Sequence, residues 1–214
     1  MLALFDLDGT ITRQDTLLPY LCGFLRQQPA RLLRLPQGLA PLARFALGRA
    51  DRGELKAGWI RTVLGGSTRT QLQAWTARFV PPLIGHGLIA DAVAAIQAHQ
   101  RAGDRLVLLS ASPDLYVPAI GRALGFDQAV CTGVEWNGEH LTGRLSTPNR
   151  RGAEKARCLE ALRQQYAPQQ IVAYGNAAGD LQHLALADRG TLVNGSPPAR
   201  WAAARLGVAC RTWR

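Results

Sequence analysis

The apolar positions divide the chain into two parts with different periodicity. Residues 1–14 and 89–214 alternate short apolar runs with amphipathic segments, beginning with Leu2-Ala3-Leu4-Phe5, which ends abruptly in polar residues and a glycine. Between residues 15 and 88 apolar residues instead recur at helical spacing, without a strand pattern. We therefore predict a mostly helical cap, residues 15–88, inserted after the first strand of an α/β domain.

Alternating helices and strands in the α/β part predict a parallel sheet covered on both faces. This is a Rossmann-like, three-layer arrangement, with functional groups expected at the carboxyl ends of the strands. An Asn-Gly pair within residues 135–144 predicts a hairpin. Breaks in the helical part are expected at Pro29, Pro36, Gly65-Gly66 and Pro81-Pro82. The predicted strands are 2–5, 105–109, 129–134, 170–174 and 191–193, and the predicted helices outside the cap are 89–100, 114–124, 153–165 and 180–187.

Composition favours a folded, reduced protein. With 214 residues and 47% hydrophobic content, the chain can bury a full core. Its four cysteines form no CxxC pair, and the N-terminus lacks the layout of a secretory signal. We expect a cytoplasmic protein.

The net charge of +10 is concentrated in the helical part. Residues 12–89 hold eleven basic and three acidic residues, so eleven minus three gives +8. An excess of arginine can indicate binding to nucleic acid, to an acidic membrane face or to a phosphorylated substrate.

The most apolar part of the cap, residues 32–47, is too interrupted to span a bilayer. Arginines and prolines break it well short of about 20 apolar residues. Leucines between arginines resemble an interfacial segment, which would allow peripheral contact with an anionic membrane at its inner face. We favour the alternative, a helical hairpin that packs its leucines inward and exposes its arginines.

Two carboxylates follow the first predicted strand in the segment Asp6-Leu7-Asp8-Gly9-Thr10. At this spacing they can point to the same side of the sheet edge, and the glycine allows a sharp turn beneath them. Such a pair can hold a divalent cation while one carboxylate attacks phosphorus to form an aspartyl-phosphate. We prefer this interpretation to a polar turn with an incidental second aspartate.

Three further segments offer groups for the same site. Ser110 ends an apolar run and can donate to a phosphoryl oxygen, although Ser110 or Ser112 could instead cap the next helix. Lys155 is one of two lysines in an arginine-rich chain, which favours a compact charge beside a carboxylate and a phosphate over an exposed lysine. Asn176 and Asp180 offer oxygen ligands for magnesium, and Asp180 could also be an N-cap.

In this order and spacing, the four segments resemble the haloacid dehalogenase (HAD) superfamily of phosphohydrolases. The DxDGT segment is the most specific part of the match, which covers both portions of the α/β domain. The helical insertion resembles the cap of the phosphoserine-phosphatase-like branch (subfamily IB). Within that branch, residues 29–49, 109–113 and 174–176 look closest to the group that includes type C phosphatidylglycerophosphatases.

The resemblance implies a magnesium-dependent phosphatase. Asp6 would be the nucleophile, and Asp8 would protonate the leaving alkoxide and then activate water. Lys155 would steady Asp6 and the phosphate. Thr10, Ser110 and Ala111 would bind the phosphoryl group, and Asp6, the Asp8 backbone carbonyl, Asn176 and Asp180 would hold Mg²⁺. Many family members carry an aspartate where this chain has Asn176, so the metal site is expected to be less anionic.

Several functions remain open at this stage. The substrate could be a small phosphorylated metabolite such as phosphoserine, or a phospholipid head group. A phosphomutase would use the same aspartyl-phosphate. A nucleic-acid-binding protein is a weaker alternative, because the basic stretch lacks interleaved aromatic residues and any recognised binding motif. The sequence carries no signal for oligomeric state.

Overall fold

The computed structural model describes all 214 residues and is built around one six-stranded sheet. The strand order is β3-β2-β1-β6-β7-β8, and every neighbouring pair is parallel. The predicted parallel α/β sheet is therefore confirmed. The strands are β1 Leu2–Phe5, β2 Arg105–Pro113, β3 Gln128–Thr132, β6 Ile171–Gly175, β7 Arg189–Val193 and β8 Ala209–Arg211.

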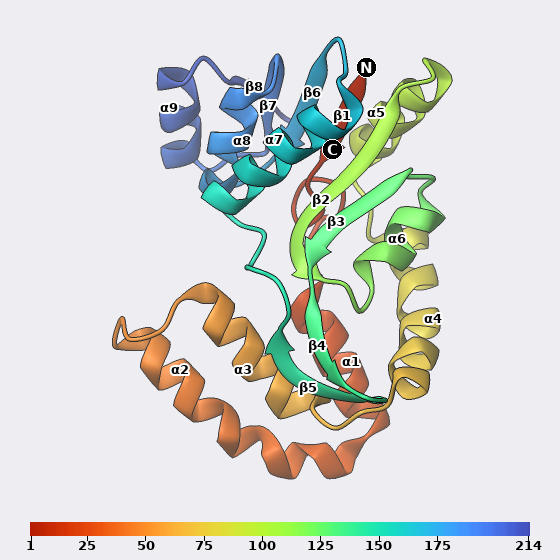
Figure 1. The fold of residues 1–214 in the computed structure, drawn as a ribbon, viewed down its shortest axis with the longest axis vertical. Coiled ribbons are helices and arrows are strands. Elements are labelled where there is room, and N and C mark those ends of the chain that lie inside the picture. Colours follow the sequence, from red (N-terminus) through yellow and green to blue (C-terminus); the bar gives the residue numbers. More distant parts are fainter.

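The sheet separates two layers of helices (Figure 1), and alternate side chains of β1 face one layer or the other. Leu2 and Leu4 join the apolar cluster under α7, α8 and α9, whereas Ala3 and Phe5 face the cluster that contains α5 and α6. Because both faces are covered, the strands are apolar on both sides. The helices of these layers are α5 Ala90–Arg101, α6 Val117–Ala123, α7 Ala153–Tyr166, α8 Leu181–Leu186 and α9 Pro197–Arg205, with the short 3-10 helix η2 Ala178–Asp180 before α8.

The cap is helical, as predicted, with two differences in its breaks. The expected break at Pro36 is wrong, because the 3-10 helix η1 (Pro29–Gly38) continues through it. The expected break at Pro81-Pro82 is also wrong, because α4 (Arg69–His86) continues through both prolines. Both are exposed, so the helix carbonyls that lose a partner can bind water. No helix in the structure is both long and apolar enough to cross a membrane. The cap helices are α1 Leu17–Gln27, η1 Pro29–Gly38, α2 Leu39–Ala46, α3 Arg52–Leu64 and α4 Arg69–His86.

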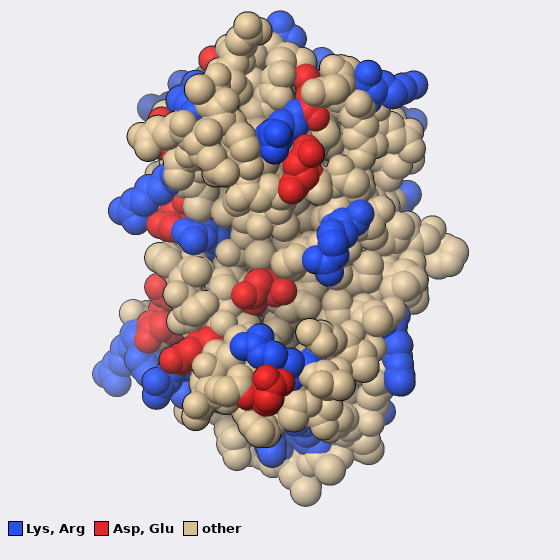
Figure 2. Space-filling model, turned by 45° about the vertical axis from the view of Figure 1, so that its right-hand side comes forward, with Lys and Arg blue, Asp and Glu red and all other residues tan.

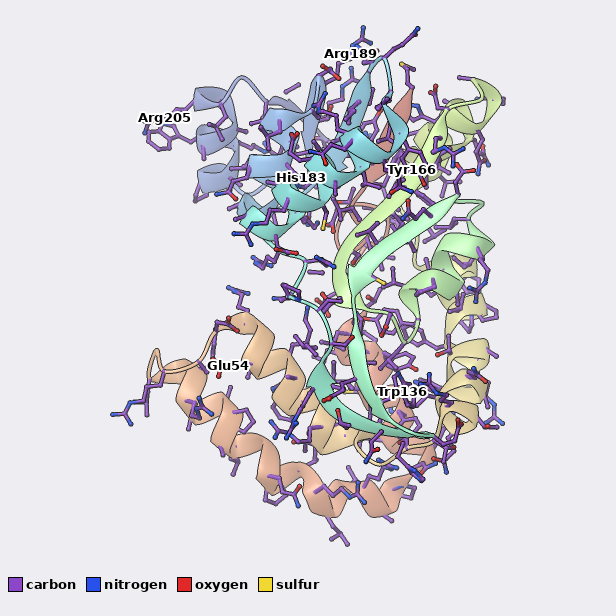
Figure 3. The ribbon with its side chains drawn as sticks, in the orientation of Figure 1. Glu54, Trp136, Tyr166, His183, Arg189 and Arg205 are labelled. Atoms are coloured by element: carbon purple, nitrogen blue, oxygen red, sulfur yellow. The ribbon has the colours of Figure 1, made fainter.

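The predicted Asn-Gly hairpin is present and packs on the cap. It consists of β4 Val134–Asn137 and β5 His140–Leu145. Gly143 lies against the backbone of Arg61 on α3, where any Cβ would collide. Arg69 at the start of α4 lies 4.2 Å from the ring centre of Trp136, which Figure 3 labels on β4. The assignment of residues 15–88 as the whole cap stays a prediction, and we propose that this hairpin belongs with the cap.

Three local expectations change. The strand predicted over 129–134 is split, because β3 ends at Thr132 and Val134 begins β4. The helix predicted from residue 114 begins at Val117, because the Asp114 backbone N–H donates to Thr132 on β3 instead. Helix α9 and strand β8 were not expected, since their small and arginine-rich segments carry little apolar periodicity.

The expectation that the cap leucines pack inward is also wrong for most of them. Helix α2 has no buried residue, and Leu33 is 85% exposed. Pro41 on α2 instead contacts Gly58 on α3, which leaves the leucines on the outside.

Candidate active site

The carboxyl ends of β1, β2 and β6 lie at the same edge of the sheet, because these parallel strands are neighbours. Phe5 pairs with Leu108 on one side and with Tyr174 on the other. The structure therefore brings together three of the predicted segments: residues 6–10 after β1, residues 110–112 near the end of β2, and residues 176–180 after β6.

Lys155, in the first turn of α7, completes this group. Its Nζ donates to Asp6 Oδ1 and to Asp180 Oδ1, both at 2.6 Å. The lysine is 2% exposed, so the alternative of a solvent-exposed lysine is wrong. Burial alone would lower the pKa of Lys155, but the Asp180 and Asp6 carboxylates outweigh burial and raise it. Lys155 is therefore a fixed positive charge.

The two carboxylates bound to Lys155 differ in their acidity. Burial raises the pKa of Asp6 to about 7; Lys155 opposes this rise, and the neighbouring Asp180 and Asp8 charges add to it. Burial also acts on Asp180, but Lys155 and hydrogen bonds outweigh it and lower the pKa of Asp180. The group thus holds more buried negative charge than one lysine neutralises.

Asp8 is held in place through both of its carboxylate oxygens. Its Oδ1 accepts from the backbone N–H and the hydroxyl of Thr16, at 2.8 and 2.6 Å, and its Oδ2 accepts from Ser112 Oγ at 2.6 Å. Burial raises the pKa of Asp8, although the bonds from Ser112 and Thr16 oppose that rise. The sequence indicated only a helix-capping role for Ser112 and gave no signal for Thr16. The capping alternative for Ser110 and Ser112 is wrong, because no side chain caps α6.

The hydroxyls predicted to bind phosphate are buried and do not line the open cavity. Thr10 and Ser110 are fully buried. Thr10 Oγ1 donates to Asp6 Oδ2 at 3.3 Å, and Ser110 Oγ accepts the Ser112 backbone N–H at 3.0 Å. Ala111, between the two serines, lines the open cavity. Their roles in phosphate binding stay predictions.

Two glycines make room for the remaining oxygen donors. Gly9 has a φ of +76°, and a Cβ there would collide with the Asn176 amide. A Cβ at Gly175 would lie 2.9 Å from the Asp180 carboxyl carbon. Asp180 Oδ2 also accepts the backbone N–H groups of Asn176 and Ala177, at 3.1 and 3.0 Å. Asp180 stands at the N-cap position of α8 without capping that helix, because its carboxylate binds Lys155 and this turn.

The oxygen-bearing residues at this edge suit magnesium, which also takes water and phosphate oxygens as ligands, better than they suit a metal bound only by protein side chains. No three His, Cys, Asp or Glu side chains gather as a metal site. Asp6, Asp8, Asn176 and Asp180 all line one cavity at this edge, and residues of these types can offer carboxylate, amide or backbone oxygens. Magnesium is usually bound through one or two carboxylates, with water and substrate phosphate completing its shell.

A cavity of about 600 Å³ lies between this edge of the sheet and the cap. Leu55 and Trp59 of α3 form part of its cap side. Its ionisable lining comprises the carboxylates Asp6, Asp8, Asp15 and Asp180 and the basic side chains Arg13, Arg52, Lys56, Arg151 and Lys155.

Lys56 on α3 is a second lysine at this cavity, so both lysines of the chain lie there. Its Nζ donates to the backbone carbonyl of Ala111 and, at 2.6 Å, to Asn149 Oδ1. Burial lowers the pKa of Lys56 to about 8. Lysine is rare in this chain, but the sequence predicted no role for Lys56, because its position depends on how the cap packs against the sheet.

Similarity to known proteins supports the same family. The sequence model for haloacid dehalogenase-like hydrolases matches residues 3–185. Protein CicA of Caulobacter vibrioides is 32% identical over 204 residues, which cover 88% of this chain and 83% of CicA.

Two solved structures share the fold. A protein of unknown function from Bordetella pertussis Tohama I has a TM-score of 0.81 at 24% identity, with 98% of this chain and 96% of that chain covered. A probable phosphoserine phosphatase from Vibrio cholerae has a TM-score of 0.71 at 18% identity, with 98% and 60% covered. The fold is thus that of the phosphoserine-phosphatase-like branch. Together with the family match over residues 3–185, this shows that the chain belongs to the haloacid dehalogenase-like hydrolases.

Proposed function

We propose that the protein is a magnesium-dependent phosphatase that hydrolyses phosphate monoesters through an aspartyl-phosphate on Asp6. The observation that carries this proposal is the arrangement of Asp6, Lys155 and Asp180, joined by 2.6 Å bonds at the edge of a parallel sheet. A buried carboxylate beside a fixed ammonium is suited to attack an anionic phosphoryl group, since the cation offsets the charge repulsion.

In the first step, Asp6 Oδ2, the oxygen that Lys155 does not bind, attacks phosphorus and the bond from phosphorus to the leaving oxygen breaks. Lys155 holds the other Asp6 oxygen and so fixes the orientation of the carboxylate. Asp8 gives its proton to the leaving oxygen. Burial raises its pKa and so favours the protonated form that this step needs, and the bonds from Thr16 and Ser112 fix its position.

In the second step, Asp8 takes a proton from water, and the resulting hydroxide attacks the aspartyl-phosphate. Asp6 is regenerated and inorganic phosphate leaves. A phosphomutase would differ only in passing the phosphoryl group to a second hydroxyl.

Asp6, the Asp8 backbone carbonyl and Asn176 are the residues that we expect to hold magnesium. Bound Mg²⁺ would neutralise the charge that develops on the phosphoryl oxygens. Because Asp180 already accepts three hydrogen bonds, we assign it mainly to positioning Lys155 and the turn at residues 176–177.

The cap side of the cavity favours a leaving group that is itself anionic. Arg52 and Lys56 on α3 face the same cavity as Arg151. A Glu/Arg pair that could bind an amino acid is not part of this lining, since Glu54 instead pairs with Arg44. Nor is there an apolar groove in the cavity between α2 and α3, which is lined mainly by polar and small residues. We therefore expect a small phosphorylated metabolite or a head group with a second negative charge.

The nucleic-acid alternative gains no support from the surface in Figure 2. On that face, basic and acidic side chains are interspersed rather than gathered by sign. A duplex-binding surface is expected to concentrate basic residues on one face.

The proposal is tested by phosphate release from p-nitrophenyl phosphate with and without magnesium. We expect Asp6→Asn to lose activity by about 10⁴-fold or more, as other enzymes do on loss of a nucleophile. Asp51→Asn is the matched control, because Asp51 is an exposed helix cap and asparagine caps equally well. Full activity of Asp6→Asn, or equal activity in excess chelator, would refute the proposal. A screen of phosphoserine, sugar phosphates and phosphatidylglycerophosphate then identifies the substrate class.

A further inference from the structure

The outer edge of the cap exposes a row of leucines. We call residues 29–49, which contain η1 and α2, the cap ridge. It follows the edge of the cap that lies away from the six-stranded sheet (Figure 1). Its exposed leucines are Leu32 (49% exposed), Leu33 (85%), Leu39 (63%), Leu42 (42%) and Leu47 (67%).

These leucines are not the packing face of the cap ridge. Contact with α3 is made by Gly38 against Trp59 and by Pro41 against Gly58. Leu35 packs against the hydrophobic core, and Phe45 is half-buried. Much of the apolar surface of the exposed leucines therefore has no partner in the protein.

The charged residues of the cap ridge itself all have one sign. Residues 16–50 contain five arginines and no acidic residue. Arg34, Arg44 and Arg49 of the cap ridge are exposed. Arg44 contacts Glu54, which Figure 3 labels at the start of α3, but both side chains are more than half exposed and the pair is weak.

We propose that the cap ridge docks on an anionic lipid surface, with its leucines in the acyl boundary and its arginines at the head groups. Apolar side chains flanked by arginines are the composition that binds such surfaces, and each arginine near the surface contributes about 1 kcal/mol. With ten 3-10 residues and eight α-helical residues, the ridge is roughly 30 Å long, enough to contact several lipids.

Charge complementarity favours lipid over a second copy of the chain. Two copies packed ridge to ridge would bring eight arginines together, with no acidic residue in residues 29–49 of either copy to pair with them. Nucleic acid would satisfy the arginines but would leave the leucines exposed to water. The proposal does not depend on the phosphatase chemistry.

Vesicle co-sedimentation of the full chain tests this inference. The vesicles are phosphatidylcholine alone or phosphatidylcholine with phosphatidylglycerol. We expect the wild-type chain to sediment with the anionic vesicles only, and less so at high salt. Leu33→Ser with Leu47→Ser should weaken binding at least tenfold. Arg44→Gln with Arg49→Gln should weaken it by about 30-fold, since 1 kcal/mol per arginine is about fivefold each.

Leu186→Ser with Leu206→Ser is the matched control. These two leucines belong to the α/β domain, lie outside the cap, and are 45% and 51% exposed. This control should bind as the wild type does. Activity on p-nitrophenyl phosphate and the thermal midpoint should stay unchanged in every variant, which shows that each is folded. Failure of the wild type to bind anionic vesicles would overturn the proposal, as would equal binding by the ridge leucine variant. A dimer in gel filtration that only the ridge leucine variant dissociates would assign the surface to a second copy instead.

Discussion

The two lysines of this chain face the same cavity from opposite sides, and their surroundings differ. Lys155, on the core side, lies between the carboxylates of Asp6 and Asp180, whose charges raise its pKa. Lys56, on the cap side, is bound to the neutral oxygens of Ala111 and Asn149, and burial lowers its pKa to about 8. One ammonium is paired directly with two carboxylates, whereas the other contacts only neutral oxygens, with Asp8 and Asp15 near enough to oppose the fall in its pKa.

This difference indicates a division of labour across the cavity. An anionic substrate offers Lys155 little new stabilisation, because that ammonium is already paired. For Lys56, a second anionic group on the substrate would replace two neutral acceptors with a charge, which is a stronger hydrogen-bonding partner. We infer that the core side performs the chemistry, whereas the cap side selects the leaving group.

Lys155→Met should have the largest effect. It leaves Asp6 and Asp180 buried without their shared cation, and such a loss costs about 3–5 kcal/mol. At 2–4 °C per kcal/mol, the thermal midpoint should fall by roughly 6–20 °C, and activity should be lost with it. Lys56→Met is the matched control and should unfold at or above the wild-type temperature. Equal midpoints for the two variants would contradict the distinction between the lysines.

Gly9→Ala should have an intermediate effect that separates backbone strain from crowding of the site. Gly9 and Gly66 share a φ of +76°, but nothing lies within 4 Å of a Cβ at Gly66, whereas one at Gly9 meets Asn176. Both alanine variants should lose about 1 kcal/mol of stability. Only Gly9→Ala should also require more magnesium for half-maximal activity, by about tenfold or more. If Gly66→Ala shifted the magnesium requirement equally, displacement of Asn176 would not be the cause.

The core side of the site could be predicted because its signals are local. Asp6 and Asp8 follow a buried apolar run, and parallel pairing brings that strand end next to the ends of two others. Lys155 was identified through its rarity. These assignments required only the positions of the strand ends along the chain, which apolar periodicity indicates. The order of the strands in the sheet was not predicted.

The cap side could not be predicted, because it depends on how the cap meets the sheet. Thr16 reaches Asp8 only once α1 is in place, and Lys56 reaches Ala111 across 55 positions. The inner and outer faces of α2 were assigned wrongly for a related reason. Leucines usually pack inward, but here Gly58 and Pro41 set the contact between α2 and α3. A contact between two single residues, such as Gly58 and Pro41, leaves no periodic pattern in the sequence.

Lys56→Met should have a smaller effect that depends on the substrate. We expect kcat/KM to fall by about 10- to 100-fold for substrates with a second anionic group, the range expected for a hydrogen bond to a charged group. For p-nitrophenyl phosphate, whose leaving group carries no second anion, kcat/KM should change little. Steady-state kinetics with both substrate types measures the contrast. An equal loss on both would place Lys56 in the chemistry itself rather than in selection of the leaving group.

The smallest effect should be the pH dependence that Lys56 adds to folding. Its folded pKa of about 8 lies below the reference value of 10.5, so between these values the unfolded chain binds more protons and stability rises with pH. The contribution should be roughly 1 kcal/mol between pH 8 and 9. Denaturant unfolding of the wild type and Lys56→Met across this range isolates it, because other titrating groups are common to both. A constant difference between the two proteins would mean that the cap lysine keeps its proton, and selection of the leaving group would then persist above pH 8.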